Sequence, residues 1–475
     1  MRRHRLMLVL TMAMALTGCA VGPDYVRPDL PVPGSFTVAP AAAPDSAGEV
    51  VLAPAVDPEF WRGLGDPLLS QLVDAALESN HDLRIALANY DRANALLRGA
   101  RFDRYPTVTA GGSAASERAT ADAAPGASRE ERDLDRYGAD IRAGWELDLF
   151  GRVRRSVEAQ RAERDAAASD LAALQIVIVG EVARSYMELR GLQERLRVAR
   201  ANAVNQRDTL ELVEARVGAG RDTDFDRSRA RAQLETTLAR VPALESAVAV
   251  TLHRLAVLTG RPPAALTAQL ASAAPLPALP ASVDAGTPGE LLRRRPDVIA
   301  AEARLHAATA RVGIATADLF PRFTLAGLIG TQAIDTDALF ERDSEVRFAA
   351  LGVDWSFLDV GRVRARIAAA DADAAAALAG YEQAVLLALE DTENALVRLA
   401  KARLEDRHLE SAALDSATAA RLARLRFEAG AVDLLDVLDA ERTQLLAQDA
   451  FADARTRSAT AAVGLYRALA GGYGR

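Results

Sequence analysis

Three charged residues near the C-terminal end have a spacing that brings them to one face of a helix. Asp436, Asp439 and Arg442 follow one another at intervals of three, and residues three apart are neighbours on a helix surface. Such a face can repel like charges, form an ion pair or attract a cation. A simpler interpretation is that the helix dipole stabilises acidic side chains in a first helical turn, and that Asp433 and Asp436 form a capping pair.

Residue patterns of enzymes are not found in the chain. No Ser/His/Asp arrangement stands out, and no Gly-rich phosphate loop follows a strand. The five histidines are scattered without metal-ligand spacing: His4, His81, His253, His306 and His408. We therefore expect no enzymatic activity, no metal and no cofactor other than a covalent lipid.

The N-terminus predicts a secretory leader in residues 1–18. Residues 2–5 are basic, residues 6–16 are apolar, and Leu16-Thr17-Gly18-Cys19 resembles the lipobox at which bacterial lipoproteins are cleaved and lipidated. Cys19 is the only cysteine, so an exported chain would have no disulfide. We expect lipidation at Cys19. Since Ala20 and not an acid follows it, the outer membrane is the expected destination.

Charge and hydropathy narrow the class of protein. Removal of the leader takes away three arginines and no acid, which changes the formal charge from −8 to −11. A chain this acidic is not expected to bind nucleic acid. After the leader, we see no run of about eighteen apolar residues that would predict a membrane-spanning helix.

A motif that occurs twice shows that the chain contains an internal repeat. The stretch from Trp145 to Gly151 returns 210 positions later, from Trp355 to Gly361, and Gly220 returns as Gly430. The period is far too long for a solenoid, so two tandem copies are predicted. We place the first repeat at 59–260 and the second at 289–470. The remaining segments are a Pro-rich lipid-anchored tether (19–58), a Pro-rich linker (261–288) and a C-terminal tail (471–475).

Each repeat predicts a long helical hairpin. Residues 152–217 and 362–428 contain no proline, and at about 1.5 Å per residue each helix would be roughly 100 Å long. Apolar residues at steps of three and four predict narrow interhelical seams. The hairpin turns are expected at 218–222 and 429–432, followed by return helices with Thr223 and Asp433 as N-caps, the first return helix ending near Gly260. Shorter helices are expected at 66–103 and 289–319.

A pair of strands precedes each long helix. Residues 135–149 alternate apolar and polar side chains from Tyr137 to Leu149, which is long enough to cross a tilted barrel wall. Weaker candidates lie at 106–117, 321–333 and 345–357. A soluble sheet is the alternative to a membrane barrel. Because lipid tolerates no open sheet edge and bacterial barrels begin at about eight strands, several chains would have to share one barrel.

The chain resembles the TolC-like outer-membrane efflux proteins, most closely the NodT-type lipoprotein branch. The resemblance is carried by Val21-Gly22-Pro23-Asp24-Tyr25, Phe60-Trp61, Asp66-Pro67-Leu68, the segment from Trp145 to Gly151, and the segment from Leu435 to Ala440. It implies a mainly α fold with a membrane β-barrel: a trimer with four strands per chain, twelve in all, continued by a periplasmic α-helical tunnel. It also implies an exit duct of a tripartite pump that exports small molecules such as drugs or toxic compounds, passively, with a gate at its periplasmic end.

The same resemblance assigns sites and partners. In the family, acids at the positions of Asp436 and Asp439 ring the periplasmic aperture; Val432 stands where some relatives have arginine, so Arg442 is the candidate pairing residue. The hairpin tips would dock a periplasmic adaptor, which joins the duct to an inner-membrane transporter, often of the resistance-nodulation-division (RND) type. The tip residues are Arg216, Val217, Gly218, Gly220, Arg426, Phe427 and Gly430. A duct for type I protein secretion and a lipid-anchored coiled-coil scaffold remain as alternatives.

Overall fold

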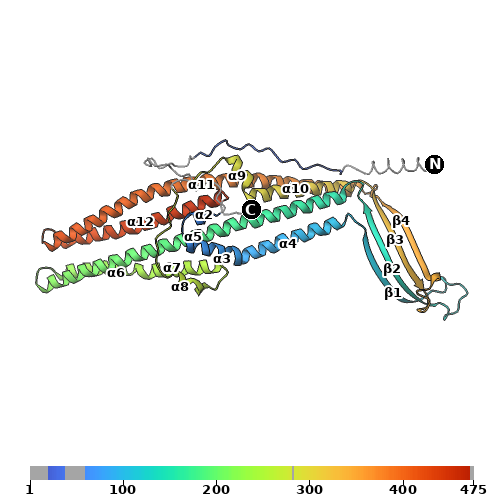
Figure 1. Cartoon of the computed structure of the whole chain (residues 1–475), viewed down its shortest axis with the longest axis horizontal. Helices are drawn as coiled ribbons and strands as arrows, with labels where there is room; N and C mark the ends of the chain where they lie inside the picture. The colour runs from blue at the N-terminus through green and yellow to red at the C-terminus, as the bar shows by residue number, and fades with distance from the viewer. Residues whose placement is uncertain (1–19, 38–58, 281–282, 471–475) are drawn as a thin grey trace. The chain divides into compact units, whose positions relative to one another are not determined.

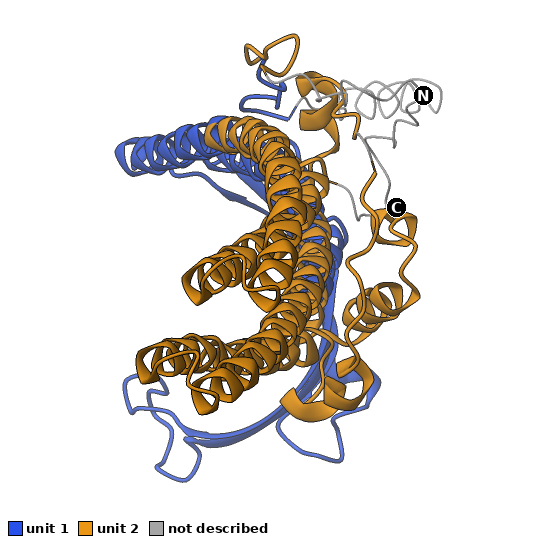
Figure 2. Cartoon of the chain, turned by 90° about the vertical axis from the view of Figure 1, so that its left-hand side faces the viewer, with its two compact units in different colours: residues 1–29, 89–168, 300–382 blue, residues 30–88, 169–299, 383–475 orange. Residues whose placement is uncertain are grey.

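The computed structural model describes residues 20–37, 59–280 and 283–470. The predicted leader, Cys19, part of the predicted tether and the predicted tail lie outside the described residues. The chain forms two compact units, coloured separately in Figure 2: unit 1 is 1–29, 89–168 and 300–382, and unit 2 is the remainder. The boundary between the units falls inside four helices, α4, α5, α10 and α11.

Unit 1 contains one antiparallel sheet whose strands follow one another in chain order (Figure 1). The strands are β1 (Thr107–Arg118), β2 (Asp133–Leu147), β3 (Arg322–Ala333) and β4 (Glu345–Asp354), with a short 3-10 helix η2 (Arg342–Ser344) before β4. The predicted strands are confirmed, but β2 lies two residues closer to the N-terminus than predicted, and β4 ends three residues before its predicted end. In the described chain, β1 and β4 each have one neighbouring strand, so each keeps an open edge.

The long helices are present as expected. They are α5 (Arg152–Gly218) and α11 (Val360–Glu428), and the return arms are α6 (Asp224–Leu238) with α7 (Arg240–Leu258), and α12 (Leu434–Ala468). The first return arm is divided at Ala239 because Pro242 has no N–H for the Leu238 carbonyl. Thr223 caps α6 in a capping box with Asp226, and Asp433 caps α12, as predicted.

The prediction of a single helix at 66–103 is wrong. The structure has α3 (Pro67–Ser79) and α4 (His81–Phe102), separated by Asn80 in an extended conformation. The Asn80 side chain donates to the Leu258 carbonyl (2.9 Å) and accepts from the Asp82 and Leu83 N–H groups. It thus ends one helix and caps the next.

The N-cap of α3, Asp66, also has a tertiary role. Asp66 accepts hydrogen bonds from the N–H groups of Leu68 and Leu69, and the Tyr186 hydroxyl donates to its second oxygen (2.5 Å). Burial, followed by the hydrogen bond to Asp66, raises the pKa of Tyr186 to about 12. The phenol therefore remains a donor across the physiological range.

The helix predicted at 289–319 is also two helices, α9 (Pro288–Arg294) and α10 (Pro296–Ala317). Arg295 between them is extended, since a residue before proline avoids the helical region. The buried Arg295 guanidinium pairs with Asp297 (2.6 Å) and donates to the Ala468 carbonyl (3.1 Å).

The predicted linker at 261–288 is not a simple spacer. It contains the 3-10 helix η1 (Pro263–Leu266) and α8 (Thr267–Leu270), and Leu266 and Leu270 are fully buried. They pack in the main core of unit 2 with α2 (Phe60–Gly63) and residues of α5 and α12. A Pro-rich composition did not reveal this burial.

Residues 20–27 of the predicted tether are bound within unit 1. The Val21 N–H donates to the Phe150 carbonyl (3.1 Å), and the buried Arg155 pairs with Asp24 (2.6 Å). The Tyr25 ring stacks on His306 at 4.5 Å. Residues 20–27 are therefore a docked extended segment.

Three helices contradict our expectation of no apolar window of membrane-spanning length. By length and composition alone, Arg152–Gly218, Asp224–Leu258 and Val360–Glu428 each contain one. The share of the window that is buried inside the protein is 44% in Arg152–Gly218, 22% in Asp224–Leu258 and 17% in Val360–Glu428.

Candidate functional site

The predicted gate residues lie on the exposed face of the start of α12. The packed face of this helix is Leu434, Val437, Leu438, Glu441 and Leu445, all buried. Asp436, Asp439 and Arg442 lie outside that stripe and are exposed. Side chains three apart thus share a face, as predicted, and the face is turned away from the core of unit 2.

Two of the three gate residues form an ion pair. Arg442 donates to Asp439 at 2.6 Å, and both side chains are about 60% exposed (63% and 60%). Asp433 accepts the Asp436 N–H at 3.3 Å, as in a helix cap. Among the described residues, the Asp436 carboxylate has no ion-pair partner. Asp439 and Arg442 also line a cavity of about 340 Å³ with Arg229 and Gln233 of α6.

A buried acid beside the gate was missed by the sequence analysis. Glu441 is 3% exposed. One of its oxygens accepts from Arg424 of α11 (2.6 Å) and from the Thr209 hydroxyl of α5 (2.7 Å), while the other has no hydrogen-bond partner. The signal was a glutamate on the apolar stripe of α12, between Leu438 and Leu445.

The two hairpin tips, residues 218–222 and 429–432, close in the same way. The Arg221 N–H donates to the Arg216 carbonyl (2.9 Å), and the Ala431 N–H donates to the Arg426 carbonyl (2.8 Å). Gly220 and Gly430 both have φ +71°, the left-handed conformation that ends a helix in this way.

The side chains of the tips divide into supporting and exposed groups. Phe427 is only 2% exposed, and the Arg216 guanidinium lies 4.4 Å from its ring centre and pairs with Asp222. Val217 is half-buried, whereas Gly218, Gly220, Arg426 and Gly430 are exposed. The Phe427 ring lies in the tip core beneath Arg216, and its role in docking stays a prediction.

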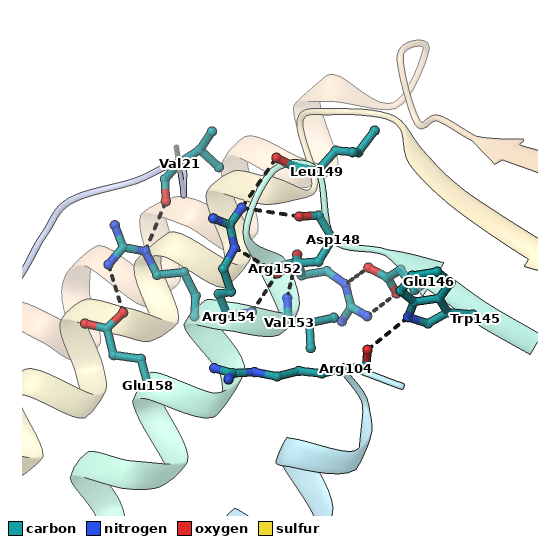
Figure 3. A network of polar contacts seen from close by, with 11 residues as sticks. Val21, Arg104, Trp145, Glu146, Asp148, Leu149, Arg152, Val153, Arg154 and Glu158 are labelled. Carbon is teal, nitrogen blue, oxygen red and sulfur yellow. Dashed lines mark hydrogen bonds and ion pairs between the residues drawn. The ribbon is translucent and has the colours of Figure 1, made fainter. Parts of the chain in front are cut away.

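A polar network joins β2 to the start of α5 (Figure 3). The Trp145 indole donates to the Arg104 carbonyl (3.1 Å), and Arg152 forms a two-bonded ion pair with Glu146. Asp148 accepts the N–H groups of Val153 and Arg154, which caps α5. We call residues 145–155 the first junction.

The tether docks on the same turn of α5. Arg155 donates to the Val21 carbonyl and pairs with Glu158, which also bonds His306 (2.9 Å). Burial opposes ionisation of Glu158, but the bonds from His306 and Arg155 outweigh it and lower its pKa. The site therefore keeps a charged carboxylate. No group of three or more His, Cys, Asp or Glu within residues 20–37, 59–280 and 283–470 could hold a metal.

An antiparallel sheet with two open edges, joined to helices of nearly seventy residues, is the architecture of a channel subunit that shares a barrel with other chains. The family model for outer membrane efflux proteins matches residues 72–261 and 287–471, which correspond to the two repeats. The chain belongs to the outer membrane efflux protein family.

Curated relatives and solved structures agree with this assignment. The chain is 33% identical to outer membrane protein OprJ of Pseudomonas aeruginosa, covering 98% of this chain and 95% of the relative. It is 30% identical to nodulation protein T of Rhizobium leguminosarum, covering 97% and 96%. The structure of the outer-membrane channel OprN matches with TM-score 0.87 and 40% identity, over 96% of this chain and all of that one.

The fold class is thus that of the TolC-like trimeric channels, in which each chain supplies part of a barrel and part of a helical tunnel. The protein is an outer-membrane efflux channel, and its helical part belongs to the periplasmic side. The scaffold alternative is excluded by this membership.

Proposed function

We propose that three copies of this chain form the exit duct of a tripartite efflux pump and that small molecules pass through it passively. The observation that carries the proposal is the four-stranded sheet with two open edges in a chain of this family. Relatives support a small-molecule cargo: one is named for pyoverdine export and another as part of a toluene efflux pump, both in Pseudomonas putida. No observation favours type I protein secretion.

The partners follow from the same proposal. The exposed tip residues Gly218, Gly220, Arg426 and Gly430, with Val217 and Arg216 behind them, contact a periplasmic adaptor. The adaptor joins the duct to an inner-membrane transporter of the RND type. A lipid on Cys19 is the second attachment to the outer membrane.

The proposed gate is an acid ring at the start of α12. Under threefold symmetry, the exposed Asp436 and Asp439 form rings of like charge, which repel unless cations or arginines compensate them. The first repeat lacks this face: 210 positions earlier, Asp226 is engaged as a cap, and Arg229 and Ala232 replace Asp439 and Arg442. Only the second repeat therefore supplies the acids.

Conductance measurements in planar bilayers test the gate. Replacing both Asp436 and Asp439 by Ala should reduce cation preference and divalent block by at least about twofold, since even an exposed charge contributes roughly 0.5 kcal/mol. The matched control is Asp224→Ala, which removes another exposed helix-start acid that pairs with an arginine three residues on. Unchanged selectivity and block in the double variant would show that the gate lies elsewhere.

A further inference from the structure

The four-stranded sheet of unit 1 (Figure 1) has two faces that differ in composition. Because side chains alternate along a strand, the strand pairing assigns every residue to one face. Ile141, Ile329 and Leu351 share a face that is mostly apolar, whereas Asp140 and Arg142 lie on the other face. In the strands of a membrane barrel, the apolar face contacts lipid and the polar face lines the lumen.

Three large apolar side chains lie together on the face that lines the lumen. Leu328 of β3 is directly opposite Phe348 of β4, and Val346 lies two residues from Phe348 on the same strand. Leu328 is half-buried, but Phe348 is 56% exposed. We call these three residues the lumen patch. A group of exposed apolar side chains on a face that meets water marks a place where another molecule makes contact.

The lumen patch is present in the second repeat only. The repeats correspond at a separation of 210 positions in β2 and β4, and of 215 positions in β1 and β3, as from Thr107 to Arg322. The first-repeat counterparts of Leu328, Val346 and Phe348 are Ser113, Arg136 and Gly138. The first repeat forms the same strands with these small or polar residues, so strand formation does not require the patch.

An ion pair of the first repeat lies beside the patch, because β2 and β3 are neighbours. Arg142 is opposite Leu328, and Asp140 is opposite Gly330. Arg142 donates two hydrogen bonds to the Asp140 carboxylate (2.6 and 2.9 Å). The Asp140 side chain is 15% exposed and that of Arg142 is 64% exposed. The lumen is therefore offered the cation of this pair more than the anion.

Strand register aligns the cation with the apolar residues. Arg142, Leu328 and Phe348 form one row across three adjacent strands. Neighbouring strands lie about 4.8 Å apart, so this row extends over roughly 10 Å. In the next row, a Cβ at Gly330 would lie 2.7 Å from the Asp140 Cβ. Glycine at this position therefore leaves room for the carboxylate that holds Arg142 beside the patch.

We propose that the lumen patch and Arg142 form a contact site for amphipathic aromatic anions that pass through the barrel. The aromatic body lies on the apolar side chains, with Phe348 as its ring partner, and a carboxylate or sulfonate group accepts hydrogen bonds from Arg142. The site is open to the lumen, so binding is weak and reversible, as passage requires. The inference rests on the proposed exit duct and names a class of cargo that its barrel contacts.

Current block in planar bilayers tests the site. Naphthalene-2-sulfonate, added on the side of the loops that join β1 to β2 and β3 to β4, reaches the barrel without passing the proposed gate. It should reduce the single-channel current more than methanesulfonate, which has the same charged group without the rings. Phe348→Ala should weaken this block by roughly two- to tenfold, the range expected for the loss of one aromatic contact, and Phe348→Tyr should retain it.

The matched control for Phe348→Ala lies on the same strand. Leu351→Ala removes a large, exposed side chain of β4 from the face that contacts lipid, so it should leave the block unchanged. Equal block of the unmodified channel by the two anions would overturn the lumen patch. Equal weakening by Phe348→Ala and Leu351→Ala would overturn it as well.

Two substitutions in the ion pair should have opposite effects. Asp140→Asn removes the carboxylate that neutralises Arg142, so it should strengthen block by naphthalene-2-sulfonate. Arg142→Gln removes the cation and should weaken the block. Both effects should decrease as the salt concentration rises, because salt screens exposed charges. A change of the same sign in both variants would show that Arg142 does not bind the anion.

The outcomes separate this inference from the proposed function. A protein that forms conducting channels, and in which the four substitutions leave the block unchanged, overturns the contact site and leaves the exit duct intact. A protein that forms no channel in the bilayer contradicts the exit duct, and this inference with it.

Discussion

Single residues at the start of α12 have two different roles. Asp436 and Asp439 are exposed, and Asp439 pairs with Arg442, whereas Glu441, two positions after Asp439, is buried and joins three helices through Arg424 and Thr209. A buried carboxylate must stay paired because removing it from water is costly. The pair of buried Glu441 and partly exposed Arg424 therefore holds in place the helix that carries the exposed acids.

Arg424→Ala should destabilise the protein strongly. It leaves the Glu441 charge buried without its cation, at an expected cost of about 3–5 kcal/mol. Replacing both residues by leucine should recover most of this loss, measured by thermal denaturation in detergent. Equal melting temperatures of Arg424→Ala and the double variant would show that the Glu441 charge is not the source of the loss.

Helices of the fold end where a side chain replaces a backbone hydrogen bond or where a proline removes the N–H donor. Asn80 separates α3 from α4, Pro296 separates α9 from α10, and Pro242 divides the first return arm. Each break is followed by a new helix, so a helical pattern in the sequence continues across it. The breaks allow short helices to pack beside long ones.

Asn80→Ala should lower stability by about 1–3 kcal/mol, because it removes the cap of α4 and leaves the buried Leu258 carbonyl without its side-chain donor. The control is Glu78→Ala, an exposed residue in the last turn of α3. Chemical denaturation of the two variants should show a large shift only for Asn80→Ala. A similar, small shift for both would mean that the break is held by other contacts.

At the scale of the whole molecule, the chain is one subunit of an outer-membrane channel, and its sheet has two edges to be covered. A barrel shared by several chains satisfies the backbone groups of those edges, which lipid cannot do. Attachment to the membrane should therefore come from the strands more than from the lipid.

We expect Cys19→Ser, expressed with a cleavable leader, to remain in the outer-membrane fraction after extraction with high salt and alkali. The strands stay embedded without the acyl chains, because a closed barrel leaves no backbone polar group unpaired in lipid. Sedimentation and detergent electrophoresis provide the measurement. Complete release of the variant, with the unmodified protein retained, would assign attachment to the lipid alone.

The sequence determined what depends on neighbours along the chain. Alternation from Tyr137 to Leu149 predicted β2, the proline-free stretches predicted α5 and α11, and Thr223 and Asp433 marked helix starts. These signals are local because strand alternation and helix capping involve residues a few positions apart. The repeat and family motifs then placed four strands in each chain.

Only the tertiary structure decided the features that depend on distant partners. Asn80 breaks a helix through a residue 178 positions away, Phe427 is buried beneath Arg216, and Glu441 finds its cation on another helix. The linker leucines Leu266 and Leu270 join the core although their segment is rich in proline. Burial is set by which surfaces meet in space, and no window of sequence contains both surfaces.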